Sequence, residues 1–231
     1  MLLFWVIISN CFAQSTFDSI PINSVISIQA LPEYEKRLIS DSNLVRCQPL
    51  IKELVLVKVR YWGFDDQEHH GALIVHATLG KEVVAIFQEL FEQRFPIQAM
   101  QPIPANLKKD PSIYDNITGA FYCRDVTDQP GILSQHSYGR AIDINPLINP
   151  YVKGCLIIPA GSQKHISRIY PEKGKIMPNS LATNLFARYG WDWGGNFVDC
   201  VDYQHFEKRA NGEKRDPFGY VSPFTYKINY C

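Results

Sequence analysis

The sequence has 231 residues, of which 46% are hydrophobic and 20% are charged. This balance is typical of a globular protein, and the length is sufficient for one domain with a well-buried core. Lys and Arg together number 23, as do Asp and Glu, so the formal net charge is zero. A bulk electrostatic attraction to nucleic acid or to an anionic membrane is therefore excluded, and specificity must come from a local site.

The chain begins with an apolar segment, Leu2 to Ile8, that is too short to span a bilayer. Ala13 offers a small residue for cleavage before Gln14, so residues 1–13 are predicted to be a signal peptide. No Lys or Arg precedes the apolar segment, and a buried first strand or helix is the alternative. No other segment is long and apolar enough to cross a membrane. We expect a secreted or periplasmic protein, with attachment to the cell envelope left open.

The first half of the chain predicts a leader, two strands and a helix. Residues 14–50 form the leader, and the Val-rich segments 54–62 and 71–77 are predicted to be strands. Residues 82–95 have the periodicity of an amphipathic helix that ends before Pro96. Its apolar face comprises Val83, Ile86, Phe87, Leu90 and Phe91.

The second half alternates short strands with irregular segments. Strands are predicted at 119–124, within 134–145 and at 202–207, and a helix at 181–189. The segment 149–179 contains several prolines and glycines and is predicted to be a long surface excursion. Few helices with several strands indicate the α+β class in a single domain.

The main domain is predicted to span 51–210, followed by a C-terminal tail at 211–231. The six cysteines, at positions 11, 47, 123, 155, 200 and 231, include no CxxC pair, so a structural zinc knuckle is not expected. One or two disulfides with one thiol left over, or buried free cysteines, are both compatible with this pattern.

Four of the six histidines stand in ordinary contexts. His69 and His70 follow an acidic segment and are predicted to lie in a solvated turn. His76 is predicted to be a core or edge residue of a strand, and His165 to be exposed.

His136 and His205 differ because each has an acidic residue nearby. Asp143 follows His136 after Gly139, which can supply a bend that turns both side chains toward one point. Asp202 precedes His205 and is expected on the loop just before it. Two imidazoles and one carboxylate suit a catalytic Zn²⁺ that keeps its fourth position open for water.

Two further groups complete the candidate chemistry. Asp202 could take the proton of the zinc-activated water and pass it to the leaving amine. Arg124 could face the developing oxyanion, or it could be a surface arginine. On spacing alone a pair of polar surface strands remains the stronger interpretation.

Two motifs bear a resemblance to a known family. The segment SQHSYGRAID, which begins at Ser134, resembles the SxHxxGxAxD motif of the D-alanyl-D-alanine carboxypeptidase and dipeptidase family of zinc peptidases. GWDWGG from Gly190, followed by DYQHF from Asp202, resembles that family's second motif. The branch that looks most similar contains the VanY-type carboxypeptidases and the phage L-alanyl-D-glutamate endopeptidases. The motif-bearing resemblance covers 121–207.

The resemblance implies a role for each matching residue. His136, Asp143 and His205 look like the ligands of one Zn²⁺, and Asp202 looks like the general base. Arg124 looks like the arginine that holds the scissile carbonyl. The family fold implies a central antiparallel sheet that carries the zinc site and is flanked by helices.

Four further residues are candidate substrate contacts. Trp191 and Trp193 would wall the cleft, although aromatic residues of the core are the competing interpretation. Ser134 is expected to be a substrate contact or to support a ligand, and Tyr138 to contact substrate.

The function implied is that of a zinc metallopeptidase that cleaves peptidoglycan stem peptides as a D-alanyl-D-alanine carboxypeptidase. An L-alanyl-D-glutamate type endopeptidase, a non-catalytic cell-wall binding module and a different metal hydrolase on the same scaffold are the alternatives. The expected partner is a peptidoglycan peptide rather than nucleic acid, and the expected state is a monomer.

Overall fold

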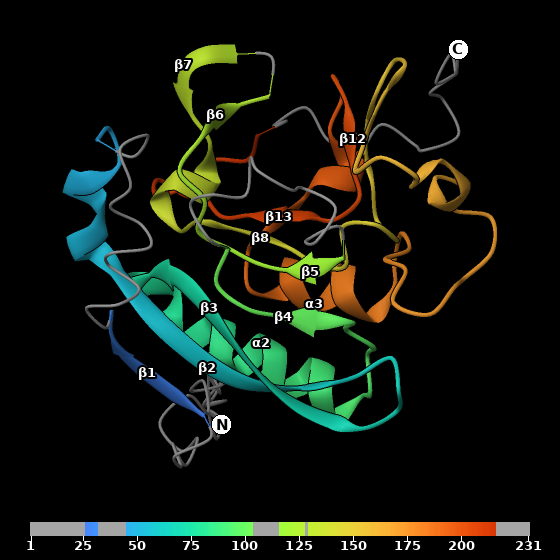
Figure 1. Cartoon of the computed structure of the whole chain (residues 1–231), viewed down its shortest axis with the longest axis horizontal. Coiled ribbons are helices and arrows are strands. Elements are labelled where there is room, and N and C mark those ends of the chain that lie inside the picture. Colours follow the sequence, from blue (N-terminus) through green and yellow to red (C-terminus); the bar gives the residue numbers. More distant parts are fainter. Residues whose placement is uncertain (1–25, 32–44, 104–115, 128, 216–231) are drawn as a thin grey trace, which may run out of the picture.

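The computed structural model describes residues 26–31, 45–103, 116–127 and 129–215 (Figure 1). The predicted signal peptide, most of the leader and most of the C-terminal tail lie outside these residues, so those assignments stay predictions. Within the described ranges, no helix has both the length and the apolar character needed to cross a membrane.

The first sheet is antiparallel, in the order β1 (Ser27–Ala30), β2 (Leu54–Trp62) and β3 (Glu68–His76). The prediction for β2 is confirmed, but β3 begins three residues before the predicted strand. His69 and His70 therefore lie in β3, where they pair with Tyr61 and Arg60, and the predicted solvated turn is wrong for both.

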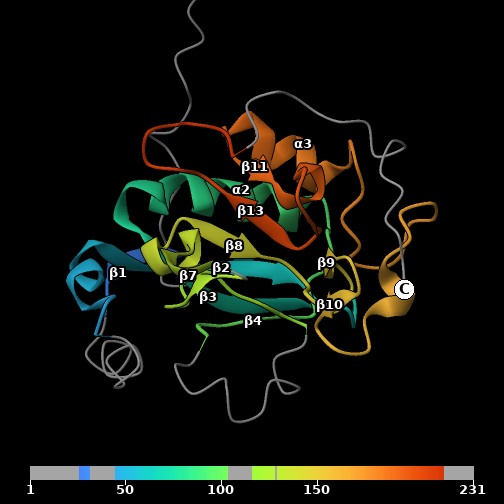
Figure 2. The same cartoon turned by 90° about the horizontal axis from the view of Figure 1, so that it is seen from above.

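Helix α2 (Gly80–Glu92) covers one face of this sheet (Figures 1 and 2). The predicted apolar face is confirmed by the burial of Val83, Ile86, Phe87 and Leu90, whereas Phe91 is only partly buried. The helix ends three residues earlier than predicted. Arg94 adopts a left-handed backbone with φ of 54°, and the N–H of Phe95 bonds back to the carbonyl of Leu90, which closes the helix.

A second apolar cluster lies against the opposite face of the sheet. It contains Leu54, Leu56 and Ile74 together with Phe121. A disulfide between Cys47 and Cys123 closes it. Cys200, by contrast, is a buried free thiol.

The central sheet that carries the candidate site is antiparallel, in the order β11 (Asp192–Trp193), β13 (His205–Glu207) and β8 (Ala141–Asp143). Helix α3 (Leu181–Arg188) packs beside it through Phe186, which stacks on Phe206 with ring centroids 3.9 Å apart. The same cluster of buried residues includes the apolar face of α2, so one continuous core joins both sheets.

The segment predicted to be a surface excursion contributes two strands to a third sheet, whose order is β10 (Leu156–Ile158), β9 (Tyr151–Lys153) and β12 (Val201–Asp202). Strand β12 ends at Asp202, and a turn separates it from β13, so the predicted single strand 202–207 is divided in two.

Buried polar contacts fix this segment to the domain. The Asn149 side chain donates to the carbonyls of Ile144 and Gly174 and accepts the N–H of Ile176. His165 is buried and bonds to Glu172, because the chain turns back on itself here, so the prediction that it is exposed is wrong.

The remaining elements are short. Residues 121–124 lie in no strand, so most of the strand predicted at 119–124 is wrong; Gly119 forms only an isolated bridge to Asp143. The other strands pair as β4 (Ala99–Met100) with β5 (Ile117–Thr118), and β6 (Asp125–Val126) with β7 (Gln129–Leu133). The 3-10 helices are η3 (Gln48–Glu53), η4 (Ala77–Leu79), η7 (Gln135–Tyr138), η8 (Gln163–His165) and η9 (Gly194–Asn196). The predicted α+β class is confirmed.

Candidate metal centre

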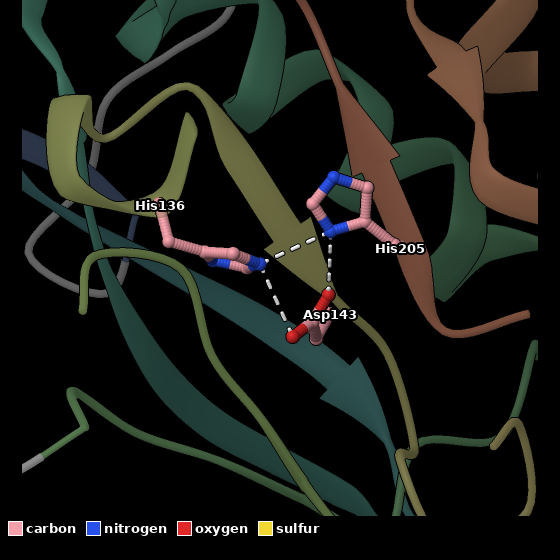
Figure 3. Close-up of side chains that lie close together, drawn as sticks. All are labelled: His136, Asp143 and His205. Carbon is pink, nitrogen blue, oxygen red and sulfur yellow. Dashed lines mark hydrogen bonds and ion pairs between the residues drawn. The ribbon is translucent and has the colours of Figure 1, made fainter. Parts of the chain in front are cut away.

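Asp143 and His205 meet because they are direct partners in the register of β8 and β13. Side chains of directly opposite residues in an antiparallel pair lie on the same face of the sheet. The Nδ1 atom of His205 lies 3.0 Å from Oδ1 of Asp143 (Figure 3). The pairing of β8 with β13 thus brings together two residues that are 62 positions apart in the sequence.

His136 reaches the same point from η7. Its Nε2 atom lies 3.1 Å from Nδ1 of His205 and 3.2 Å from Oδ2 of Asp143 (Figure 3). Ser134 precedes the helix as its N-cap, where its hydroxyl accepts the N–H of His136. Ser134 is therefore a support for His136 in this structure.

Gly139 provides the bend that the sequence pattern requires between His136 and Asp143. It ends η7 in a left-handed conformation with φ of 65°. Its carbonyl accepts the N–H of His76 at the end of β3. A Cβ at this position would lie 2.6 Å from the backbone nitrogen of His76, so only glycine fits without a backbone shift.

We therefore expect Gly139→Ala to lower the free energy of unfolding of the metal-free protein by at least about 2 kcal/mol, because it adds backbone strain to a steric overlap. Gly131→Ala is the matched control, since Gly131 also has a positive φ, 93°, but open space where the Cβ would be. It should lose only about 1 kcal/mol. Urea unfolding of both variants measures the difference, and equal losses would contradict the steric explanation.

Two hydrogen bonds on the far side of the imidazole rings set which nitrogens face the centre. His136 Nδ1 lies 2.6 Å from the carbonyl oxygen of Ala120, which can only accept, so this nitrogen carries the proton. His205 Nε2 lies 3.1 Å from Oε2 of Glu207 and donates to that carboxylate. The lone pairs of His136 Nε2 and His205 Nδ1 are therefore left to face Asp143 in the neutral rings.

This donor set fits a zinc ion. Within the described part of the chain, His136, Asp143 and His205 form the group of metal-ligating side chains whose ligand atoms lie within 4.8 Å of one another. Zn–N and Zn–O bonds of about 2.0 to 2.1 Å in a tetrahedron require ligand atoms roughly 3.3 to 3.4 Å apart. The two histidine nitrogens are 3.1 Å apart, and Asp143 lies 3.0 Å from His205 through Oδ1 and 3.2 Å from His136 through Oδ2, so the separations are near that value.

Three acceptors that converge in a buried place need a cation between them. In the metal-free protein a proton fills this need: burial lowers the pKa of His205, but the carboxylates of Asp143 and Glu207 outweigh burial and raise it to about 10. The pKa of Asp143 falls well below its usual range because the two histidines outweigh the burial that would raise it. A metal ion can replace the proton at the same position.

Glu207 stays ionised although it is buried. Burial raises its pKa, but the hydrogen bonds from His205 and Arg209 outweigh burial and lower it to about 2. Neither sequence motif includes Glu207. Its signal was present, because residues two apart on a strand share a face, and His205 and Glu207 stand two apart in β13.

Asp202 is the last residue of β12 and pairs with Tyr151 of β9, so the prediction that it lies on a loop is wrong. Its Oδ1 atom is buried and has no hydrogen-bond partner. Burial raises the pKa of Asp202 and the charge of Asp143 adds to this effect, while His205 and Arg124 oppose it. A partly buried carboxylate beside the triad with an unsatisfied oxygen can accept a proton.

Arg124 lies outside any strand, contrary to the prediction that a strand carries it. Its backbone N–H donates to the hydroxyl of Ser137, the residue after His136, at 2.9 Å. Its guanidinium donates to the carbonyl of Asp125 and is close enough to lower the pKa of Asp202. The structure thus brings Arg124 to the same region as the candidate base.

The prediction that Trp191 and Trp193 line the substrate cleft is wrong for this structure. Trp191 is 2% exposed and Trp193 is 6% exposed, and both belong to the continuous core. Trp191 donates from Nε1 to Glu82, and Trp193 donates to the carbonyl of Tyr203. The competing interpretation, that they are core aromatics, holds for both. Tyr138 is partly buried in η7, and its role as a substrate contact stays a prediction.

Residues 127–208 match a family model described as D-alanyl-D-alanine carboxypeptidase. The matched part contains the three convergent residues and Asp202, whereas Arg124 lies three residues before it. The resemblance to this peptidase family is thereby confirmed for the part of the chain that forms the site. No curated protein and no solved structure matches the chain.

Proposed function

We propose that the protein is a zinc peptidase that removes the terminal D-alanine from peptidoglycan stem peptides. The observation that carries this proposal is the convergence of His136 Nε2, Asp143 and His205 Nδ1 next to the partly buried carboxylate of Asp202. The match of this segment to a D-alanyl-D-alanine carboxypeptidase model supports the choice of substrate.

His136, Asp143 and His205 would hold the zinc ion as its three protein ligands. Zinc, when bound, polarises the scissile carbonyl and lowers the pKa of the attacking water. Asp202 takes the proton of that water and passes it to the leaving amine as the peptide bond breaks. The raised pKa of Asp202 suits both steps, because a group that holds a proton more firmly is a better base and can still act as an acid.

Arg124 supplies positive charge on the side of Asp202. We assign it to the carbonyl oxygen of the substrate, where negative charge develops as water adds to the carbonyl carbon. Its backbone is tied to Ser137, so the same short segment, η7, fixes both the first ligand and the arginine.

We also propose that the protein acts outside the cytoplasm, at the cell wall. The disulfide between Cys47 and Cys123 supports this location, because structural disulfides form and persist in oxidising compartments. The predicted signal peptide points the same way.

Mass spectrometry of digests with the zinc-loaded protein tests the reaction. We expect a synthetic stem pentapeptide that ends in D-Ala-D-Ala to lose one D-alanine, and the same peptide with an L-Ala-L-Ala terminus to stay intact. EDTA should stop the reaction and added zinc should restore it. Cleavage between L-alanine and D-glutamate would identify an endopeptidase instead, cleavage of the all-L peptide an ordinary peptidase, and no cleavage a binding module.

A further inference from the structure

We infer that Glu207 is a positioning residue that fixes the orientation and the tautomer of His205, so that Nδ1 and not Nε2 binds the metal. This inference rests on the proposed zinc function, and it assigns a role to a residue that neither sequence motif includes.

The geometry places Glu207 on the opposite side of the His205 ring from the metal centre. Oε2 of Glu207 lies 3.1 Å from Nε2 of His205, while Nδ1 of the same ring lies 3.0 Å from Asp143. Both side chains are almost fully buried, with 5% of His205 and 4% of Glu207 exposed. Water is therefore a poor substitute for either partner.

The orientation of Glu207 is itself fixed. Its second oxygen, Oε1, accepts a hydrogen bond from Nε of Arg209 at 2.9 Å. Its backbone pairs on one side with Ala141 of β8 and on the other with Asp192 of β11. The carboxylate thus has a partner for each oxygen and belongs to the central strand of the sheet, which leaves it little freedom to turn away.

An imidazole can bind a metal through either nitrogen, and rotation of the ring by half a turn exchanges the two edges. With Glu207 in place, the proton of the neutral ring sits on Nε2, where it is donated to the carboxylate. Rotation of the ring would turn its C–H edge toward that carboxylate and leave a buried charge without its hydrogen bond. The neutral ring of His205 has two orientations and two tautomers, which give four arrangements. Glu207 therefore stabilises one of these four.

The ionised carboxylate also increases the electron density of the ring. A histidine that donates to a carboxylate is a more basic metal ligand than one that donates to a neutral group. The charge of Arg209 compensates the charge of Glu207 in the absence of metal, so the strand can hold the carboxylate at a buried position.

A purely structural role is the alternative. In that case Glu207 would stabilise β13 through Arg209, and its removal would lower the free energy of unfolding without any specific effect on zinc. The two roles differ in whether the metal-binding equilibrium changes in protein that remains folded.

Zinc affinity, measured by competition with a chromogenic chelator, separates the two roles. We expect Glu207→Ala to weaken zinc binding by about 100-fold, and the nearly isosteric Glu207→Gln, which keeps an acceptor but loses the charge, by about 10-fold. The visible spectrum of the Co²⁺-substituted variants should also differ from that of the wild type, because the ring of His205 is no longer held in one orientation.

Glu82→Gln is the matched control. Glu82 is also a largely buried carboxylate, and it accepts hydrogen bonds from Trp191 at 3.0 Å and from Lys208 at 2.7 Å. Its substitution should lower the free energy of unfolding and leave the zinc affinity and the Co²⁺ spectrum unchanged.

Zinc dissociation constants of both Glu207 variants within about twofold of the wild type would overturn the inference, as would equal weakening by Glu82→Gln. If Glu207→Ala does not fold, Glu207→Gln alone decides between the roles. Peptide cleavage is measured separately: wild-type protein that binds zinc but cuts no stem peptide would overturn the proposed reaction and leave the role of Glu207 in place.

Discussion

His205→Ala is expected to remove zinc binding and peptide cleavage together. The substitution deletes one of three ligands, and it also leaves Glu207 buried without the hydrogen bond that His205 donates. Loss of the metal removes several kcal/mol of transition-state stabilisation, so the rate should fall by about 10³-fold or more. Zinc content after dialysis, measured by atomic absorption, and kcat/KM on a D-Ala-D-Ala peptide check the two parts.

The matched control is His165→Ala. His165 is 7% exposed, close to the 5% of His205, and it too is held by a glutamate, with its Nδ1 atom 3.0 Å from Glu172. Both substitutions therefore remove a buried histidine from a carboxylate partner, but only one removes a predicted metal ligand. His165→Ala should lower the free energy of unfolding and keep one zinc per chain. Cleavage that persists in metal-free His205→Ala would contradict a metallopeptidase.

The meeting of Asp143 and His205 shows what spacing alone cannot predict. Their side chains converge because β8 pairs with β13 in one particular register, and that register is set by the core that joins Ile142 and Phe206 to the helices. No local pattern encodes a pairing across 62 residues. The resemblance to the peptidase family supplied it, whereas the bend at Gly139 could be expected from the residues themselves.

The two tryptophans of the second motif show that residue type alone does not decide between a cleft and the core. Aromatic residues next to a predicted site are equally suited to a cleft and to a core, because their large apolar surface favours burial in both. Trp191 lies in the core because its ring packs against Phe186, and Glu82, 109 residues earlier in the sequence, accepts the hydrogen bond of its Nε1. Glu207 was missed for a simpler reason: the motif ends at Phe206, although the alternation of a strand places residue 207 on the same face as His205.

The folded form of the segment 149–179 was also beyond local prediction, and it bears directly on the candidate base. Its glycines and prolines indicate irregular structure, yet β9 pairs with β12 and holds the backbone of Asp202 opposite Tyr151. The backbone of Gly194 also packs closely against Asp202. A Cβ at Gly194 would lie 2.5 Å from the carbonyl oxygen of Asp202. The segment therefore helps to position the backbone of the candidate base.

Asp202→Asn should separate catalysis from metal binding. Asp202 is not one of the convergent ligands, so the variant should keep one zinc per chain. An amide cannot accept the proton of the attacking water, and loss of a general base lowers kcat by about 10² to 10⁴-fold. Asp199→Asn is the matched control, because Asp199 lies three residues earlier but is exposed and paired with Arg215; its kcat should not change.

The pH dependence of the wild-type enzyme provides an independent readout of the same carboxylate. Asp202 must be ionised to accept a proton, so kcat/KM should fall as the pH falls through its pKa. In the metal-free protein burial, aided by the charge of Asp143, raises that pKa above 3.8, whereas the charge of bound zinc would lower it, so the position of the acid limb reports the balance of the two effects. Asp202→Asn should abolish the limb in the residual activity, and Asp199→Asn should keep it. A residual rate with the wild-type acid limb would assign the proton transfer to another group.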